Sequence, residues 1–247
     1  MKKVFVSVLV GLALGAVSSV SAIDMSAGGG AFFASDFGGG VEAKISYQGR
    51  FIERTMKTPY SGGGINAFLD VTYAEISVGY LFAGGKWESE GKTNIPGDPG
   101  YKSSLDASFS AIQLGLLGKY PIALSDEMTV FPAAGIHYQS CISGAYKSPG
   151  GSEEIKWDGK NGRPKAADYS AVIFNFGGGL DFALAENMFI RSELLYGIRL
   201  ASKAEDDMVK ELKPDADDAK RRGYDVTGPN ARLGHGLTIK AGVGLRL

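Results

Sequence analysis

Apolar and polar residues alternate along much of the chain, most regularly in its last segment, from Gly236 to Leu247. Successive side chains of a β-strand point to opposite faces, so this segment has one apolar face and one face that carries Lys240 and Arg246. A helix would mix the two classes around its surface. The segment also has about the ten residues that a tilted strand needs to cross a bilayer. We therefore predict a membrane-crossing strand at this end of the chain.

Seven further segments alternate in the same way, and turn or loop sequences separate them. The predicted strands occupy about residues 27–37, 65–73, 76–83, 105–120, 128–141, 169–182, 188–200 and 236–247. Short connections near 74–75, 121–127 and 183–187 alternate with long ones near 38–63, 84–104, 142–168 and 201–234. An even strand number with short turns on one side and long loops on the other is typical of outer-membrane barrels. The pattern predicts an all-β fold, an eight-stranded antiparallel transmembrane up-and-down β-barrel with four long extracellular loops.

Several local features depart from simple alternation. Residues 41–48 alternate within the first long connection and either extend the first strand or form a loop hairpin. Apolar residues change from odd to even positions around Ala111, which predicts a β-bulge there or a strand that begins only there. Pro132 predicts a bulge or weak pairing within its strand. Pro214 would interrupt a helix, so we expect 201–234 to be a solvated loop with at most a helical turn around 208–212.

The polar faces of the predicted strands hold glycine, serine, threonine and isolated charges. This composition suits a narrow lumen better than a solvated surface, which favours a membrane barrel over a soluble exported barrel. The predicted lumen charge network consists of Asp70, Lys119, Asp181, Arg191, Glu193, Arg199, Lys240 and Arg246. We expect these charges to pair for structural reasons, and the alternative is a gate that opens a small pore. Their spacing does not tell which acid pairs with which cation.

Aromatic residues are expected at both borders of the membrane. Tyr73, Tyr120 and Phe182 fall near the predicted short turns, on the periplasmic side. The outer border or the region above it would hold Tyr47, Phe82, Trp87, Phe109, Tyr138 and Tyr169.

The N-terminus has the pattern of a secretory signal peptide, predicted to comprise residues 1–22. Lys2 and Lys3 precede an apolar run, and Val20-Ser21-Ala22 is a small-x-small cleavage site. The remaining domain, 23–247, contains no second long apolar run and hence no predicted transmembrane helix. We expect Sec-dependent export and a location in the outer membrane.

Composition and candidate chemistry narrow the function further. A formal net charge of -1 gives no bulk basic field, so we expect no nucleic-acid partner. The single cysteine, Cys141, excludes an intrachain disulfide and a multi-cysteine metal site. His137 and His235 fall near the extracellular ends of strands, where an acyl-cutting enzyme would need them. Because no nucleophile elbow or metal-ligand spacing accompanies them, we expect no enzymatic activity, no metal and no cofactor.

Residues 72–80, residues 243–247 and the signal peptide resemble the small eight-stranded outer-membrane barrels, the OmpW/OmpX/OmpA-like group. The glycine-rich style is similar to spirochaetal (treponemal) members. The resemblance implies insertion into outer-membrane lipid by the barrel-insertion machinery, which reads the C-terminal strand from Gly236 to Leu247. Such proteins usually end in an aromatic residue, and Leu247 stands in that place here.

The resemblance also implies a narrow channel for small or apolar molecules. The expected function is therefore that of an integral outer-membrane protein, structural or porin-like. Two alternatives remain open at this stage: a surface adhesin whose loops bind a host or environmental ligand, and an outer-membrane lipid-modifying enzyme.

Overall fold

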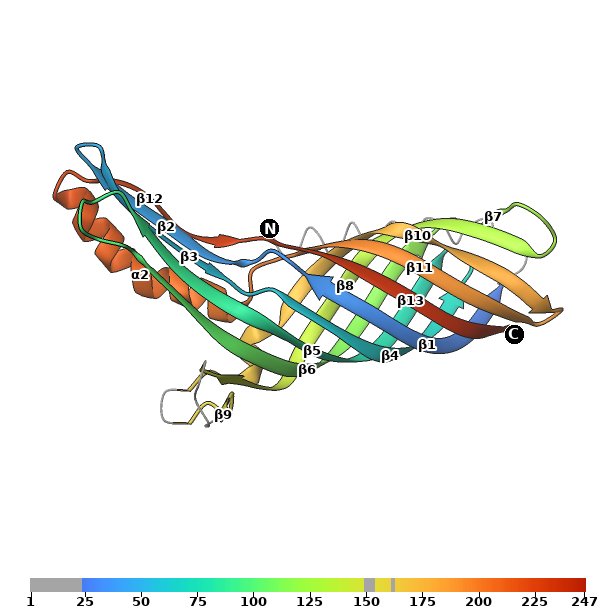
Figure 1. Cartoon of the computed structure of the whole chain (residues 1–247). Helices are drawn as coiled ribbons and strands as arrows, with labels where there is room; N and C mark the ends of the chain where they lie inside the picture. The colour runs from blue at the N-terminus through green and yellow to red at the C-terminus, as the bar shows by residue number, and fades with distance from the viewer. Residues whose placement is uncertain (1–23, 149–153, 161–162) are drawn as a thin grey trace.

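The computed structural model describes residues 24–148, 154–160 and 163–247, and one antiparallel sheet dominates it (Figure 1). The predicted signal peptide, residues 1–22, lies outside the described residues. The thirteen strands are β1 (Met25–Asp36), β2 (Gly40–Tyr47), β3 (Arg50–Lys57), β4 (Tyr60–Val71), β5 (Ala74–Thr93), β6 (Tyr101–Lys119), β7 (Ile122–Ala123), β8 (Met128–Lys147), β9 (Glu154–Lys156), β10 (Ala171–Ala185), β11 (Met188–Arg199), β12 (Asp225–Arg232) and β13 (Gly234–Arg246). A short 3-10 helix, η2 (Ala166–Tyr169), and an α-helix, α2 (Lys203–Arg221), complete the described part.

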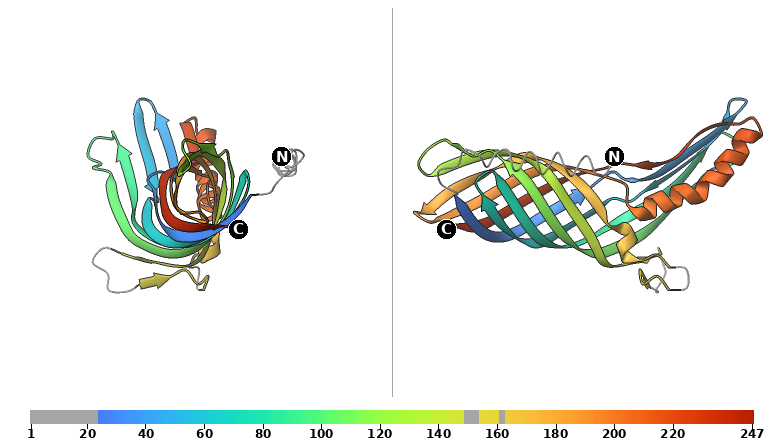
Figure 2. Two further views of the ribbon diagram at one scale, coloured as in Figure 1. Left: turned by 90° about the vertical axis from the view of Figure 1, so that its right-hand side faces the viewer. Right: turned by 180° about the vertical axis from the view of Figure 1, so that it is seen from behind.

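The barrel is a closed ring of antiparallel pairs (Figure 2). Around the ring, β1 pairs with β4, β4 with β5, β5 with β6, β6 with β8, β8 with β10, β10 with β11, β11 with β13, and β13 again with β1. The described chain is therefore an all-β antiparallel barrel. Its sheet holds thirteen strands and not the predicted eight, because the long connections contain β2, β3, β9 and β12 and the short connection 121–127 contains β7.

Beyond one end of the barrel the sheet continues as an extension, which we call the wing (Figure 1). The wing consists of β2, β3, β12, α2 and the outer ends of β5 and β6. β12 pairs with β2, β2 with β3, and β3 with the outer end of β5. α2 lies along β12 and β2. Residues 41–48 thus belong to a loop hairpin, which was one of the two alternatives that the sequence left open.

α2 contradicts the expected solvated loop, since it is a continuous helix of 19 residues that contains Pro214. Ser202 and Glu205 form a capping box at its start, which satisfies backbone donors of the first turn. Ala216 is buried against the sheet, whereas Pro214 lies on the exposed face. The stabilisation that the cap and the packed face give to the helix outweighs the loss of one backbone hydrogen-bond donor at Pro214. In the described residues, no helix combines the length and apolarity needed to cross a membrane.

The side chains of β6 alternate between the inner and outer faces of the wall without interruption. Its apolar residues nevertheless lie on the inner face in one half of the strand and on the outer face in the other. Ile112 and Leu114 are exposed on the outside, whereas Ala107 and Ala111 are buried inside. The register between β5 and β6 runs without a shift, so β6 itself has no bulge. A register shift does occur at Ser110/Ala111, but in the pairing with β8, where Ile142 is the extra residue. The apolar face therefore points outward in one half of the strand and inward in the wing half.

The structure tests two other local predictions. Of the two alternatives for Pro132, the bulge is absent, since the pairing of β8 with β10 passes this residue without a register shift, whereas interrupted pairing is present on the β6 side. The ladder between β8 and β6 ends at Ala133, which removes the need for a donor at Pro132. The turn expected at 74–75 is formed by Thr72 and Tyr73, since Val71 pairs with Ala74.

Candidate functional site: a closed lumen and its outer rim

The barrel wall is apolar outside and polar inside. The large apolar side chains that are more than a third exposed include Phe33, Ile65, Ile76, Val78, Phe82, Leu114, Tyr138, Phe176, Ile190, Leu194, Ile239 and Val243. The buried polar side chains of the same strands include Asp70, Glu75, Lys119, His137, Gln139, Asn175, Arg191, Glu193 and Lys240. A barrel in water has the reverse arrangement, and this inverted polarity is that of transmembrane β-barrels.

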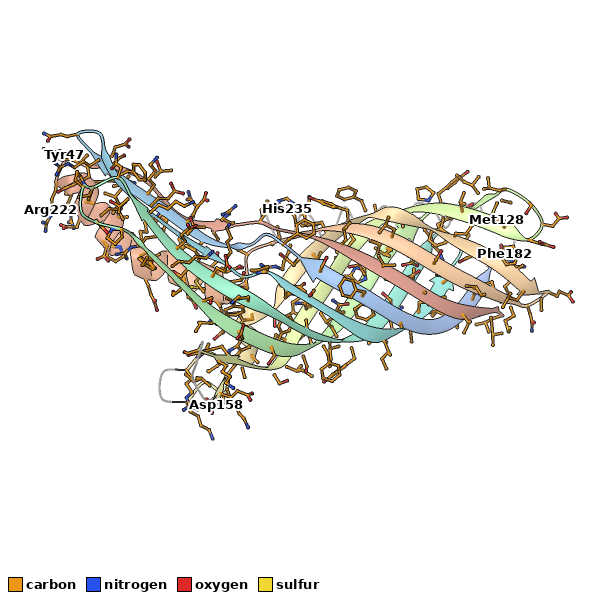
Figure 3. The ribbon with its side chains drawn as sticks, viewed as in Figure 1. Tyr47, Met128, Asp158, Phe182, Arg222 and His235 are labelled. Carbon is orange, nitrogen blue, oxygen red and sulfur yellow. The ribbon has the colours of Figure 1, made fainter. Side chains whose placement is uncertain are left out.

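The two ends of the molecule carry different structures. Figure 3 shows Met128 and Phe182 at the end of the barrel that carries the short turns, whereas Tyr47 and Arg222 mark the tip of the wing. Tyr73 and Tyr120 stack at the short-turn end with ring centroids 6.0 Å apart. Aromatic rings are therefore present at the border where the sequence predicts them.

Arg191 is the centre of a charge cluster that fills the lumen near the short turns. Its Nε and Nη2 atoms bind the two carboxylate oxygens of Asp181 at 2.7 and 2.6 Å. Nη2 also lies 2.7 Å from Asp70, and Nη1 lies 3.1 Å from Glu75. Three aromatic rings surround the guanidinium at 4.4 to 5.1 Å, those of Phe68, Phe131 and Phe189. One cation thus holds three carboxylates from three strands.

Two lysines complete the same cluster. Lys240 Nζ lies 2.8 Å from Glu193 and 3.4 Å from Glu75, and Lys119 forms an ion pair with Asp70. The cluster therefore contains four carboxylates, Asp70, Glu75, Asp181 and Glu193, and three cations, Lys119, Arg191 and Lys240. We call these seven residues the plug, because they occupy the lumen as paired charges with no described cavity between them.

The predicted lumen charges separate into three places. Asp70, Lys119, Asp181, Arg191, Glu193 and Lys240 meet in the plug. Arg199 lies at the other end of the lumen, near the wing. Arg246 is wrongly predicted as a lumen residue: it is exposed at the end of β13, and its guanidinium reaches the backbone oxygen of Glu186 at 3.4 Å.

The sequence analysis missed Glu75 because it assigned this residue to a turn. The turn lies two residues earlier, so Glu75 pairs with Asp70 across the strands and is 1% exposed inside the barrel. The alternation of β5 contains the signal that would have found it. If Ile76 and Val78 face outward, Glu75 must face the lumen.

His137 and His235 cannot form a common site, because they lie on opposite faces of the wall. His137 is buried in the lumen, where its Nδ1 lies 2.9 Å from the amide nitrogen of Asn175. His235 is on the outer face, where its Nδ1 is hydrogen-bonded to the Tyr196 hydroxyl at 2.7 Å. In residues 24–148, 154–160 and 163–247, no group of three or more histidine, cysteine or acidic side chains is placed to bind a metal ion.

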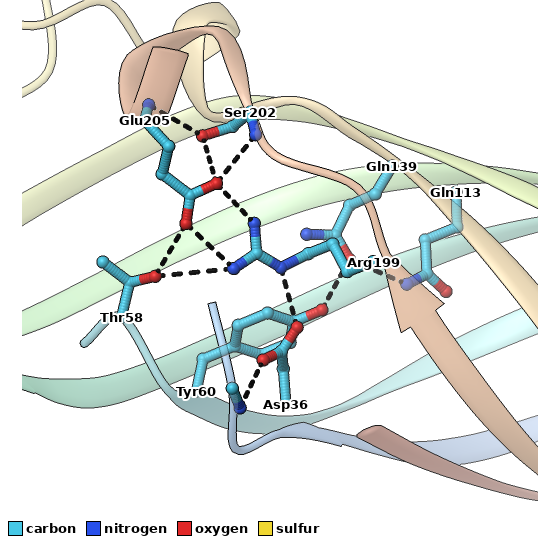
Figure 4. A network of polar contacts seen from close by, with 9 residues as sticks. Asp36, Thr58, Tyr60, Gln113, Gln139, Arg199, Ser202 and Glu205 are labelled. Carbon is cyan, nitrogen blue, oxygen red and sulfur yellow. Dashed lines mark hydrogen bonds and ion pairs between the residues drawn. The ribbon is translucent and has the colours of Figure 1, made fainter. Parts of the chain in front are cut away.

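Arg199 is the centre of a second charge cluster at the outer rim of the barrel (Figure 4). Its Nε lies 2.7 Å from Asp36 at the end of β1, and its Nη1 and Nη2 atoms lie 3.0 and 3.1 Å from Glu205 in the first turn of α2. Nη2 also reaches the Thr58 hydroxyl at 3.4 Å. We call Asp36, Thr58, Arg199, Ser202 and Glu205 the latch, because they tie α2 to the barrel.

The carboxylate of Glu205 is held in its charged form. Burial alone would raise the pKa of Glu205, but the Arg199 guanidinium and the hydrogen bonds from Ser202 outweigh burial and hold the pKa below its usual range. The Ser202 amide donates to this carboxylate at 2.7 Å, and the hydroxyl donates at 3.0 Å. The start of α2 is therefore fixed by charge-assisted hydrogen bonds.

The lumen between the two clusters is also filled. Tyr60 donates to the side-chain oxygen of Gln139 at 3.2 Å, and Gln113 donates to the same oxygen at 3.1 Å. The cavities lined by these and neighbouring side chains measure about 20 and about 30 Å³. Each has room for only about one or two water molecules. Neither of these two cavities is large enough to form a channel through the lumen.

Trp87 and Tyr169, which were predicted to lie at or above the outer border, are inside the base of the wing. Trp87 is 6% exposed and stacks on Trp157 with centroids 5.5 Å apart, and Trp157 stacks on Tyr169 at 4.2 Å. These rings pack above the point where the apolar face of β6 turns inward. This part of the molecule therefore has an ordinary apolar core with a polar exterior.

The closed antiparallel ring, its apolar exterior and its paired internal charges define the chain as a barrel of the outer-membrane type. No protein-family model and no curated protein sequence matches the chain. Among solved structures it is similar to the attachment invasion locus protein Ail of Yersinia pestis, solved with the heparin analogue sucrose octasulfate, at 10% identity and a TM-score of 0.34, over 90% of this chain and 99% of that one.

Two further solved structures are similar over most of their length. The outer membrane protease OmpT of Escherichia coli has 9% identity and a TM-score of 0.36, over 93% of this chain and 99% of that one. The translocator domain of the autotransporter NalP of Neisseria meningitidis has 12% identity and a TM-score of 0.27, over 100% of this chain and 98% of that one. At these values the likeness transfers no activity to this chain.

The expectation that the chain is not an enzyme is nevertheless contradicted by these comparisons. One of the similar structures, OmpT, is an outer membrane protease. We therefore withdraw that exclusion.

Proposed function

We propose that the protein is an integral outer-membrane barrel whose membrane part is a closed anchor and whose working surface is the wing. The membrane part would be the ring of β1, β4, β5, β6, β8, β10, β11 and β13, an eight-membered up-and-down barrel. The band of exposed apolar side chains around this ring supports the proposal, because water is a poor solvent for such a band and lipid a good one. The short turns would face the periplasm and the wing the cell exterior.

The plug is the observation that carries the closed-anchor part of this proposal. Seven charged side chains, four carboxylates and three cations, cross the lumen as ion pairs, so passage of a solute would require buried ion pairs to separate. Separating such pairs costs several kcal/mol per uncompensated charge. This supports a structural role for the lumen charges over the alternative of a gate, and it disfavours the porin-like interpretation.

The wing supports a role in binding a partner at the cell surface. It continues the barrel sheet outward, and the latch fixes its helix to the rim. A rigid scaffold that presents exposed loops is a common way to build a binding surface. We further propose that outer-membrane lipid surrounds the ring and that the barrel-insertion machinery recognises the strand from Gly236 to Leu247.

The closed lumen predicts that the protein does not conduct ions. In planar bilayers, the wild-type protein and the Glu193→Gln variant should produce no unitary current steps, because the variant keeps the size of the side chain that packs against Lys240. A general porin reconstituted in the same lipid serves as the positive control. Steps of defined size that depend on the amount of correctly folded protein would show that the lumen opens, and would refute the closed anchor.

We predict that surface binding requires the two long connections that form the wing, although they are distant from each other in the sequence. Replacing residues 41–57 and 203–231 by short glycine-serine links should leave the ring intact, since neither segment contributes to its pairing. Cells that display the wild-type protein should adhere to at least one member of a panel of immobilised matrix proteins and sulfated polysaccharides, and the shortened variant should lose this adhesion. Heat-modified gel mobility checks that both barrels are folded. Equal adhesion of the two proteins would place the binding surface outside the wing.

A further inference from the structure

The outer wall of the barrel contains a groove at the junction with the wing. It has a volume of about 580 Å³ and is lined by Phe37, Gly38, Tyr196, Arg232, Leu233 and His235. Backbone hydrogen bonds fix its two sides, from the Phe37 amide to the His235 oxygen at 2.8 Å and from the Gly39 amide to the Leu233 oxygen at 3.1 Å. Figure 3 shows His235 at this junction. The groove is thus part of the ordered wall.

The walls of this upper groove combine uncovered apolar groups with polar and cationic ones. Phe37 and Leu233 are 58% and 49% exposed, which is unusual for large apolar side chains beside the polar wing. Arg232 has an ion pair of 3.6 Å with Glu42, in which both side chains are about half exposed. Such a pair is weak, so the guanidinium remains able to bind an anion. Tyr196 and His235 add a hydroxyl and an imidazole.

A second groove lies next to the upper groove on the outer wall, mainly across β8, β10 and β11, with one lining residue from β13. It measures about 610 Å³, and its lining includes Leu194 of β11 and Ile239 of β13. Leu194 is the next outward residue after Tyr196, and Ile239 is the second outward residue after His235. Small residues create the depression, since Gly178 and Ser192 stand where other outer positions of the ring carry larger side chains. This lower groove is predominantly apolar.

We propose that the two grooves together bind one membrane lipid with an anionic phosphate head group. The head group would bind Arg232 and the polar groups of the upper groove, and an acyl chain would lie in the lower groove. Two features support a lipid as the occupant. Both grooves lie on the outer wall beside the band of exposed apolar side chains, and among the described residues that line them Arg232 is the one arginine or lysine, at the end where a head group would be. The inference rests on the membrane position that the proposed function gives to the ring.

Native mass spectrometry of the protein released from nanodiscs tests the head-group part. The nanodiscs contain equal amounts of dioleoylphosphatidylglycerol and dioleoylphosphatidylcholine. We expect the wild-type protein to retain phosphatidylglycerol about fivefold over phosphatidylcholine, the preference that one interfacial cation provides. The Arg232→Gln variant should lose this preference. Arg50→Gln, which removes an exposed cation at the tip of the wing, should keep it.

A second pair of variants tests the acyl-chain part. Ser192→Phe fills the lower groove from an exposed position and should reduce retention of both lipids to the level of non-specific carry-over. Ala67→Phe places a phenylalanine at an exposed position of β4, elsewhere on the outer wall of the ring, where no groove is described. This variant should have no effect. A folded, inserted wild-type protein that retains both lipids equally would overturn the lipid site alone. A protein that fails to insert into nanodiscs at all would overturn the proposed membrane anchor as well.

Discussion

Replacing Arg191 by methionine is expected to destabilise the barrel by roughly 3–5 kcal/mol. Methionine fills similar space but leaves Asp70, Glu75 and Asp181 without the guanidinium that binds all three. Lys119 and Lys240 remain, so two cations would face four buried carboxylates. The free energy of unfolding is measured by urea titration of the protein in lipid vesicles, with heat-modified gel mobility as the measure of the folded fraction.

Arg246→Met is the matched control for this prediction. It removes the same charge from an exposed position whose recorded contact is a backbone oxygen at 3.4 Å, so it should change the free energy of unfolding by less than about 0.5 kcal/mol. Glu75→Gln should also cost far less than Arg191→Met, because it brings the plug to three carboxylates and three cations while it keeps the shape of the side chain. If the two arginine variants are equally stable, the plug does not stabilise the barrel.

The alternation of side chains was sufficient to predict the strands of the ring and the sign of their polarity. Both are local properties, because each strand must present one apolar face whatever its partner is. The partners of the lumen charges could not be predicted in the same way. Arg191 and Glu75 are 116 positions apart, and only the closure of the ring brings them together. Glu75 was not predicted as a lumen residue for a simpler reason: the turn before β5 was placed two residues too late.

The wing was missed because its pairings are also distant in the sequence. β12 pairs with β2, so Asp225 lies opposite Ser46. The alternation of residues 41–48 indicated β2 but not this partner, which is 179 positions away. Pro214 gave the wrong signal for α2, since an exposed proline is tolerated where a capping box and a packed face stabilise the helix. The apolar residues of β6 do change from odd to even positions. The cause is not a bulge in β6 but a difference in what surrounds the two halves of the strand. One half of the strand has its apolar residues exposed on the outer wall of the ring, and the other half has them in a buried apolar cluster at the base of the wing.

Replacing Arg199 by methionine is expected to release α2 from the barrel while the ring stays folded. Asp36 and Glu205 would be left buried without their shared cation, and the helix can relieve this by moving Glu205 into water. Hydrogen exchange of residues 203–221 should accelerate roughly a hundredfold or more, whereas the amides of β11 and β13 should be unaffected. Lys203→Met, at the first residue of α2, removes exposed ion pairs with Asp168 and Asp207 and should change exchange less than about fivefold.

The pH dependence distinguishes the latch from a merely local packing effect. In the wild-type protein the pKa of Glu205 is lowered, so its contribution is fully present above the ordinary pKa of a glutamate and is lost as the pH falls through the lowered value. Without Arg199, burial dominates and the pKa of Glu205 should rise. Protonation then removes the buried charge, so the protection of α2 in the variant should increase as the pH falls from neutral. Parallel pH profiles in the two proteins would mean that the Arg199–Glu205 pair does not hold the wing.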